Sequence, residues 1–220
     1  NITYQAERVD EKTKSIKKSS QTIGVTTDYT SAATEPYHPY KIKLNTIGGT
    51  NWRVPGDFIE WEIEVPEEGL YRLSFRAKQN FNRGIASYRK IEINGDLPFM
   101  EAKAVPFTFN DGFSNYIIKD EAGDEYLFYF KEGINTLKLE TVLGDFAGPL
   151  TEVEESMLIL NDLYRKTIQI TGVVPDKFID YEITKKIPEY TEILKKESQR
   201  LNDVVEELVR ITGEKGEKTA

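Results

Sequence analysis

The chain has 220 residues, of which 39% are hydrophobic and 11% aromatic, and this is enough apolar material to exclude a wholly disordered chain. Its 37 acidic and 29 basic residues give a formal net charge of −8, which argues against nucleic acid as a partner. The absence of cysteine excludes disulfides, thiolate nucleophiles and cysteine-based zinc sites. No apolar run approaches the roughly 20 residues that cross a bilayer.

The first 39 positions hold one expected strand, at positions 2–6, and a long connection rich in Ser, Thr and Lys. The sequence begins at Asn1 with neither an initiator Met nor a signal peptide, and it ends without an obvious terminus. We therefore expect a piece of a larger protein. The run from Lys12 to Lys18 is basic but carries no aromatic residue, which predicts a solvated loop.

The clearest pattern of the chain lies between positions 58 and 78. Apolar and charged residues alternate along positions 58–65 and again along 70–78, and Pro66 and Gly69 supply the turn between the two runs. Alternation with one charged face is typical of an antiparallel sheet that covers a core on one side. Trp61 falls on the apolar side and is predicted to be a core residue.

Short alternating runs continue to about Val142, separated by Gly, Asn and Asp. The pair Asn94-Gly95 is a strong signal for a tight turn. The connection 96–124 holds five aromatic residues, so we expect it to pack on the body of the domain. The further strands that we expect are 40–44, 89–93, 126–130 and 134–142.

From Pro149 the periodicity becomes helical, with one helix ending before Gly172 and a second spanning about 188–212. We interpret the apolar stripe of each helix as a packing surface of an antiparallel pair. The stripe of the first helix consists of Leu150, Val153, Met157, Leu160, Tyr164 and Ile168. The predicted fold class is mainly β with a C-terminal α part: a jelly-roll-like antiparallel β-sandwich over residues 1–147, then a two-helix antiparallel hairpin over residues 148–220.

Catalytic motifs are scarce. The only histidine is His38, and the sequence contains no Gly-x-Ser-x-Gly elbow, no P-loop and no Gly-x-Gly-x-x-Gly. The 37 carboxylates leave a glycosidase-type acid pair open, but most of them fall on the exposed faces of predicted elements. We therefore expect a protein that is not an enzyme.

Saccharide binding is better represented, because sugar rings stack on aromatic side chains while amides and guanidinium groups bond their hydroxyls. Two loop clusters have this composition, and ordinary loop packing is the alternative interpretation of both. Trp52 follows a Gly-Gly pair and is expected to expose one ring face. The candidate saccharide-binding residues are Tyr37, Tyr40, Trp52 and Arg53 in the first cluster and Asn80, Asn82 and Arg83 in the second.

Several segments, taken in order, resemble galactose-binding-like carbohydrate-binding modules. Positions 4–7 resemble the opening strand of these modules, 56–77 their central hairpin, 91–95 the strand and turn that follow, and 128–139 their late strand pair. The resemblance covers residues 1 to about 145. It implies a jelly-roll sandwich that binds an oligo- or polysaccharide through its loops without catalysis.

The C-terminal part is similar to a region of long extracellular solute-binding proteins of Gram-positive sugar ABC transporters. Positions 143–145, 162–172 and 175–176 carry this similarity. It implies an accessory portion of a cell-surface lipoprotein, with solute-binding lobes elsewhere in the same chain as its partners.

The carbohydrate-binding-module resemblance also implies a structural Ca²⁺ with the Glu of the opening strand, which Glu7 matches, as a ligand. The family's other acidic ligand lies on a final strand, but this sequence turns helical there, so Asp145 is a substitute by position alone. Gln5 completes the three metal candidates, whereas calcium takes six to eight oxygens. An exposed Glu at a strand end is the alternative interpretation.

Two other functions stay open at this stage. The chain is, in the first alternative, a structural docking module that binds no sugar. In the second it is an auxiliary domain of a glycoside hydrolase or lyase, which shares the sandwich but not the helical segment.

Overall fold

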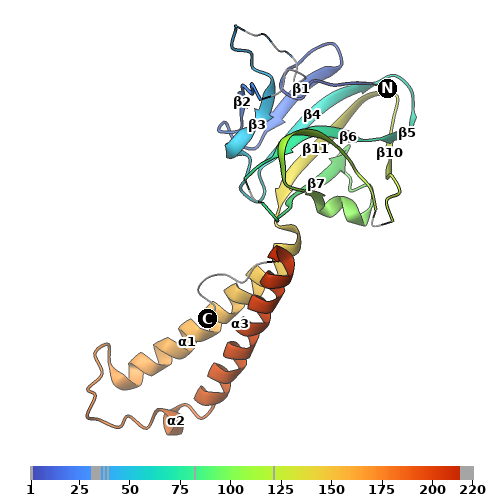
Figure 1. Cartoon of the computed structure of the whole chain (residues 1–220). Coiled ribbons are helices and arrows are strands. Elements are labelled where there is room, and N and C mark those ends of the chain that lie inside the picture. The colour runs from blue at the N-terminus through green and yellow to red at the C-terminus, as the bar shows by residue number, and fades with distance from the viewer. Residues whose placement is uncertain are drawn as a thin grey trace. The chain divides into compact units, whose positions relative to one another are not determined.

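The structure is a computed structural model that describes residues 2–30, 36, 38, 40–81, 83–120 and 122–213. The chain divides into two compact units, Asn1–Gly144 and Asp145–Ala220. Figure 1 shows strands in the first unit and helices in the second. The sequence placed this division between residues 147 and 148.

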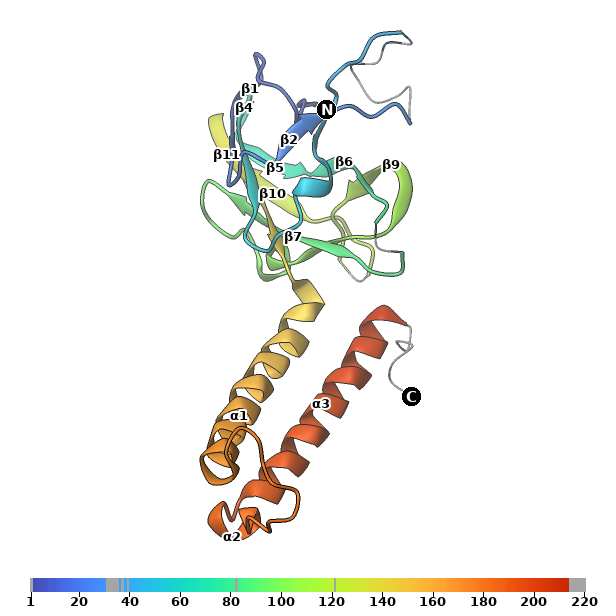
Figure 2. The same ribbon diagram turned by 90° about the vertical axis from the view of Figure 1, so that its left-hand side faces the viewer.

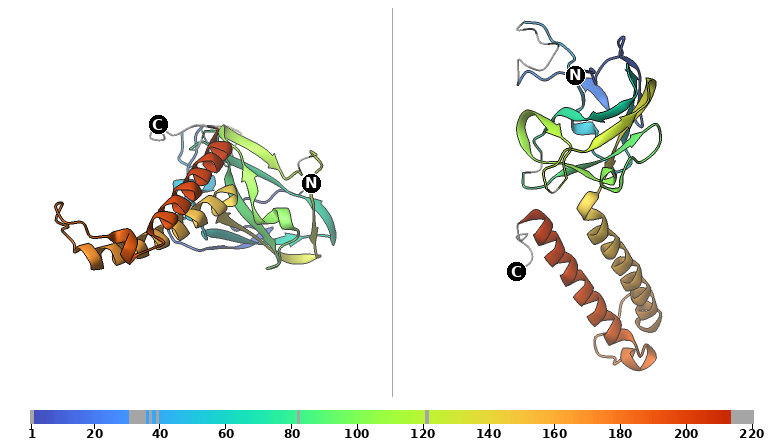
Figure 3. Two further views of the ribbon diagram at one scale, coloured as in Figure 1. Left: turned by 90° about the horizontal axis from the view of Figure 1, so that it is seen from below. Right: turned by 90° about the vertical axis from the view of Figure 1, so that its right-hand side faces the viewer.

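One layer of the first unit is a five-stranded antiparallel sheet (Figures 1 and 3). Leu139 pairs with both Ile59 and Ile91, which places three buried side chains in one row across the sheet. This register keeps Ile59, Trp61, Ile63 and Val65 of β4 on the core face, as the alternation predicts. In spatial order the strands are β1 (Thr13–Lys18), β4 (Phe58–Val65), β11 (Gly133–Val142), β7 (Ser87–Ile93) and β8 (Val105–Phe107).

The opposite layer consists of paired strands that close the core. Phe128 and Phe130 are buried against the five-stranded sheet, and Trp61 is 7% exposed, so the core lies between the layers of a jelly-roll-like β-sandwich. The pairs are β5 (Gly69–Arg72) with β10 (Leu127–Phe130), β6 (Ser74–Gln79) with β9 (Asn110–Ile117), and β2 (Gly24–Thr26) with β3 (Thr46–Gly48). The 3₁₀ turns are η1 (Gly49–Asn51), η2 (Met100–Lys103) and η3 (Gly144–Phe146).

Four expectations about the strands were wrong. The basic run is not a solvated loop but the edge strand β1, in which Lys17 pairs with Glu60 at 3.2 Å. Positions 2–6 and 40–44 form no strand, and positions 70–78 are interrupted at Leu73 between β5 and β6. The connection 96–124 packs on the body as expected, but it also contains η2, β8 and β9.

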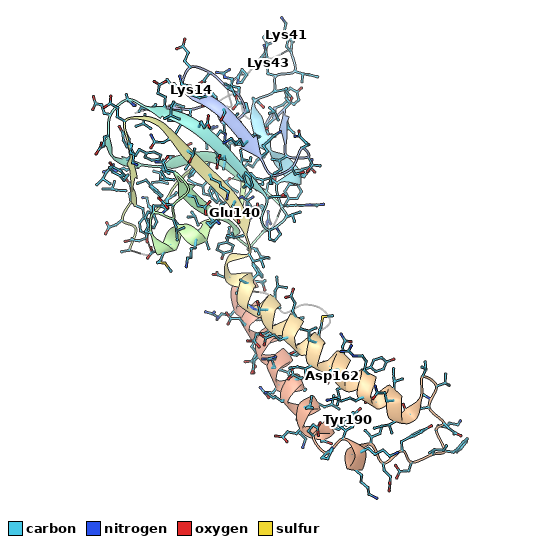
Figure 4. All side chains as sticks on the ribbon, turned by 180° about the vertical axis from the view of Figure 1, so that it is seen from behind. Lys14, Lys41, Lys43, Glu140, Asp162 and Tyr190 are labelled. Carbon is cyan, nitrogen blue, oxygen red and sulfur yellow. The ribbon has the colours of Figure 1, made fainter. Side chains whose placement is uncertain are left out.

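A four-residue ion-pair network crosses the outer face of the sheet. Lys138 contacts Glu92 and Glu140 at 3.0 and 2.9 Å, and Lys90 contacts the same two carboxylates at 3.0 and 3.1 Å. Burial alone would raise the pKa of Glu92 and Glu140, but hydrogen bonds from the two lysines outweigh it and lower the pKa of both groups. Glu140 lies on this face in Figure 4.

This network predicts a pH-dependent contribution to stability. Because the folded pKa of each carboxyl is depressed, the contribution is present above the ordinary Glu pKa of about 4.5 and is lost as the pH falls toward the folded values. We expect Lys138→Met to reduce the loss of unfolding free energy between pH 6 and pH 3 by about 1 kcal/mol. Urea unfolding at the two pH values measures this, and an unchanged pH dependence would contradict it.

The second unit is an antiparallel helical hairpin (Figures 1 and 2). Helix α1 (Ala147–Thr171) and helix α3 (Tyr190–Thr212) lie side by side, and the single turn α2 (Ile183–Lys186) precedes α3. Gly172 and Gly213 end the long helices at positive φ, and each amide donates to the carbonyl four residues back. In the described part of the chain, no helix is long and apolar enough to cross a membrane.

The seam between α1 and α3 is made only in part by the stripe that the sequence suggested, of which Val153, Leu160 and Ile168 are half-buried. Pro149, Ser156 and Leu163 are the buried residues of α1, and Ser156 Oγ bonds the buried Glu197 carboxylate of α3 at 2.7 Å. The members of the predicted stripe that follow these residues remain exposed: Leu150 by 44%, Met157 by 57% and Tyr164 by 61%. The sequence correctly predicted two paired helices, but it missed the three fully buried residues of α1.

Candidate functional site

Trp52 is built into the end of the sandwich instead of standing free on a loop. Its indole nitrogen donates to the Asp57 carbonyl at 3.2 Å, and the Arg89 guanidinium lies 4.5 Å from the ring centroid. Gly48, at φ +100°, packs so closely that a Cβ there would lie 2.9 Å from the ring. The half-buried ring thus has close neighbours in Gly48 and Arg89, and its saccharide-binding role stays a prediction.

Arg89 holds this arrangement and was missed in the sequence. Its guanidinium donates to the Trp52 carbonyl at 3.0 Å and to Ser87 Oγ at 2.8 Å. Burial lowers the pKa of Arg89 to about 10, although the negative charge of Asp57 acts to raise it. The group therefore stays charged at neutral pH and fixes the backbone that carries Trp52. The sequence offered no signal, because nothing separates this arginine from the exposed ones of neighbouring strands.

The other described residues of the first cluster, Tyr40 and Arg53, lie on the surface. Tyr40 is 93% exposed, and its amide donates to His38 Nδ1 at 3.1 Å. Arg53 is also exposed. Tyr40 begins an extended segment on which Lys41 and Lys43 lie (Figure 4). Tyr37 lies outside the described residues.

The second cluster is better organised. Gln79 fixes the loop after β6, because its side chain accepts from the Phe81 amide at 3.1 Å and donates to the Ile85 carbonyl at 2.8 Å. This presents Phe81 to solvent with 72% of its surface exposed, next to the exposed Asn80. Asn82 of the same loop lies outside the described residues.

A second element joins this loop. The Arg83 guanidinium lies 5.4 Å from the centroid of the Phe109 ring, which precedes β9, and Gln79 pairs with Asn110 in the ladder between β6 and β9. The sequence named Asn80 and Arg83 as binding residues but expected Phe109 only to pack on the body. We call the group Asn80, Phe81, Arg83 and Phe109 the loop-end site.

Further positively charged side chains lie along the paired strands β6 and β9, which we call the β6–β9 ribbon. The Phe113 ring of β9 has Lys78 at 5.1 Å and Arg76 at 6.0 Å from its centroid. Lys78 also pairs with Asp28, and although burial would raise the pKa of Asp28, hydrogen bonds from Lys78 and Thr30 lower it. The ribbon thus carries aromatic rings with positively charged neighbours from its middle to the loop-end site.

Topology brings Trp52 and the second cluster to one end of the sandwich. Glu140 pairs with Phe58 and Val142 with Tyr88, so β4 and β7 begin where β11 ends. The connection 80–86 leads from the end of β6 to the start of β7, which carries Arg89. Loops at one end of a rigid scaffold are a common location of binding residues.

The metal candidates are only partly arranged for a cation. Glu7 is 9% exposed, its Oε1 atom is buried without a hydrogen-bond partner, and burial raises the pKa of its carboxyl. It is therefore not the exposed Glu of the alternative interpretation. Gln5 is half-buried in a segment that is not a strand, and Asp145 belongs to the helical unit. Among the described residues no group of three His, Cys, Asp or Glu side chains surrounds a possible metal position.

Comparison with known proteins gives one family match, to the helical unit. Residues 149–220 match the family model for the bacterial solute-binding protein, 4-helix bundle domain. This supports the predicted similarity of the C-terminal part to solute-binding proteins. No curated protein matches the chain.

Two solved structures share part of the chain's arrangement at low similarity. The native structure of a family 35 carbohydrate binding module from Clostridium thermocellum has a TM-score of 0.39 and 18% identity, covering 64% of this chain and 85% of that one. Another family 35 module from the same organism has a TM-score of 0.28 and 20% identity, covering 38% and 57%.

Proposed function

We propose that this chain is a non-catalytic saccharide-binding accessory portion of an extracellular solute-binding protein that serves a sugar ABC transporter. The match of the helical unit to a solute-binding protein domain supports the proposal that the parent is a solute-binding protein. The observation that carries saccharide binding is the loop-end site, where the exposed Phe81 shares a loop with Asn80 and with Arg83, whose guanidinium lies over the Phe109 ring.

The proposed recognition follows from the chemistry of these groups. The apolar face of a sugar ring stacks on Phe81, while the Asn80 amide and the Arg83 guanidinium bond its hydroxyl groups. Because Phe109 holds Arg83 in place, less side-chain entropy is lost on binding. A single exposed ring buries little ligand surface, so we expect weak affinity for one site and better binding to long chains with many equivalent units.

The proposed location follows from the proposed parent. A solute-binding protein works outside the cytoplasmic membrane, and the parent is a Gram-positive cell-surface lipoprotein in this proposal. Its solute-binding lobes are the partners of this chain within the same polypeptide.

The experiment that tests the function is a glycan array followed by affinity electrophoresis in native gels. We expect the chain to be retarded by at least one polysaccharide and to release no reducing ends from it. Silence across a broad panel, from a protein whose circular dichroism shows a folded sandwich, would contradict saccharide binding. Reducing-end release would contradict the non-catalytic assignment.

We also propose that Glu7 binds a structural Ca²⁺, with Gln5 and backbone or water oxygens as further ligands. The buried, unpartnered Oε1 atom fits this proposal, because an ionised carboxylate away from water needs a compensating charge. Since Asp145 belongs to the helical unit, we leave it out of this ligand set.

Glu7→Gln distinguishes a bound cation from a protonated carboxyl. With a cation, 1 mM CaCl₂ raises the melting temperature of the wild type by several degrees and leaves the variant unchanged. Without one, the raised pKa means that the fold loses stability as the pH rises through the folded pKa, so the neutral Gln stabilises it at pH 7. Differential scanning calorimetry with and without EDTA measures both, and a calcium response equal in the two proteins would contradict the proposed ligand.

A second candidate function, a docking module that binds no sugar, is favoured by the exposed apolar residues of the helical hairpin. It predicts silence in the saccharide screen together with association through the helices. An auxiliary domain of a glycoside hydrolase or lyase has less support, because the helical unit matches a solute-binding protein domain.

A further inference from the structure

The turn directly after β7 contains the only Asn-Gly pair of the sequence, Asn94-Gly95. Both residues have positive φ, of 54° and 84°, and Ile93 and Asp96 exchange backbone hydrogen bonds of 2.9 and 3.0 Å on either side of them. Asn94 and Gly95 are exposed. Because glycine has no side chain, nothing on Gly95 hinders an approach to its own amide nitrogen. The pair is therefore open to a reaction between the asparagine side chain and the backbone that follows it.

That reaction is deamidation through a cyclic imide. The Gly95 nitrogen attacks Cγ of Asn94, so that an N–Cγ bond forms and the Cγ–Nδ2 bond breaks. The side-chain amide leaves as ammonia and takes the proton of the Gly95 amide with it. Water then opens the ring at either carbonyl carbon, which gives aspartate or isoaspartate at position 94. Water is the only co-reactant, and no group is oxidised or reduced.

The fold ties the Asn94 side chain to the neighbouring strand. Its Nδ2 atom donates to Oδ1 of Asn135 at 2.9 Å, and its Oδ1 atom accepts from the Thr136 amide at 2.9 Å. Both partners belong to β11, which lies beside β7 in the sheet (Figure 1). Because a backbone amide can only donate, the Thr136 bond fixes which atom of the Asn94 amide is the oxygen. Attack on Cγ requires this side chain to rotate toward its own backbone, and the two hydrogen bonds oppose that rotation.

Asn135 is itself held by several bonds. It is 1% exposed, and its side chain donates to the carbonyls of Lys131 and Gly133 at 2.8 and 3.1 Å. Its Oδ1 atom also accepts from the Lys131 amide at 3.1 Å. These bonds close the turn between β10 and β11, so the exposed Asn94 is bonded to a buried and fixed acceptor.

We propose that Asn94 is the deamidation site of this chain and that its hydrogen bonds to Asn135 and Thr136 form a lock that sets the rate. The reaction proceeds from the minor population in which both bonds are broken. Two hydrogen bonds of ordinary net strength reduce that population by about tenfold to a hundredfold. Once formed, a carboxylate at position 94 cannot donate to Oδ1 of Asn135, so the product does not restore the lock.

This proposal goes beyond saccharide binding and does not rest on it. Asn94 follows the end of β7, whereas the connection 80–86 precedes the start of the same strand. The turn and the loop-end site therefore lie at opposite ends of β7. Deamidation should leave retardation by polysaccharide unchanged, and the two proposals fail separately.

Peptide mapping by mass spectrometry tests the proposal during incubation of the folded chain at pH 8. Trypsin releases Asn94 in the peptide 91–103, and a synthetic peptide of the same residues gives the rate without the fold. We expect the folded chain to deamidate at Asn94 about tenfold to a hundredfold more slowly than the synthetic peptide. Asn135→Ala removes one of the two bonds and should raise the rate about threefold to tenfold. In the urea-unfolded chain, Asn94 should be the first asparagine to react.

Trp52→Ala is the control, because it removes a packed ring at the other end of the sandwich and leaves the contacts of Asn94 in place. While this variant stays folded, its rate at Asn94 should equal that of the wild type. Equal acceleration by the two variants would overturn the lock, because the reaction would then proceed through global unfolding. Equal rates in the folded chain and the synthetic peptide, or no acceleration by Asn135→Ala, would also overturn it. A different asparagine reacting first in the unfolded chain would overturn the site.

If Asn135→Ala does not fold, the wild type is incubated in urea concentrations below its unfolding transition. A rate at Asn94 that is independent of urea supports local opening of the lock, because local opening exposes little surface. A rate that follows the unfolded fraction would overturn the lock.

Discussion

Phe81→Ala is expected to weaken saccharide binding by tenfold to a hundredfold while leaving the sandwich as stable as the wild type. The ring is 72% exposed, so its removal opens no cavity in the core. In a complex the same ring is covered by the sugar, and burying an aromatic side chain is worth about 1.5–3 kcal/mol, where each 1.4 kcal/mol is a factor of ten in affinity.

Affinity electrophoresis against the retarding polysaccharide measures this effect. Tyr129→Ala is the control, because Tyr129 is another exposed aromatic residue, 48% exposed on β10, that lies outside the loop-end site. Equal retardation of wild type and Phe81→Ala would remove Phe81 from the account. Equal weakening by both variants would show that the loss of any exposed aromatic ring reduces the retardation, and that the effect is not specific to the loop-end site.

Trp52→Ala is expected to have the opposite profile, with a loss of about 3–5 kcal/mol of unfolding free energy. The indole fills the space between Gly48 and Arg89, and its nitrogen bonds the Asp57 carbonyl. Its removal leaves a cavity and takes away the ring on which the largely buried Arg89 rests. Urea unfolding by tryptophan fluorescence measures the loss, since Trp61 remains as the reporter.

The two variants separate a packing role from a binding role. Below the unfolding transition, Trp52→Ala should retain most of its retardation by polysaccharide. If Trp52→Ala is as stable as the wild type but no longer binds, the site lies at Trp52, and our assignment of the loop-end site is wrong.

The fold was largely predictable where apolar residues alternate with charges. Positions 58–65 carried enough signal to predict β4 with its inward and outward residues, and the Gly residues after each long helix predicted the helix ends. The edge strand β1 was missed because a lysine-rich run was interpreted as a solvent-exposed loop. At a sheet edge, lysine pairs with glutamates of the neighbouring strand and discourages the addition of a further strand.

The site was less predictable, because contacts between distant segments decide it. Asn80 and Arg83 were named from their residue types, but Phe109 lies on another connection and joins them only through the ladder between β6 and β9. Trp52 was named because the preceding Gly-Gly pair indicated an exposed loop, whereas Gly48 of that pair packs on the indole ring. On α1, Ser156 reads as a surface residue although it bonds a buried glutamate.

The most direct test of the central claim is a nuclear magnetic resonance titration of the isotopically labelled chain with an oligosaccharide of the retarding polysaccharide. We expect the largest amide shift changes at residues 79–85 and 108–110, around the loop-end site, with small changes on β5 and β10. Changes concentrated elsewhere on the sandwich, or none at a ligand concentration that saturates the retardation, would contradict the claim that this loop cluster binds saccharide.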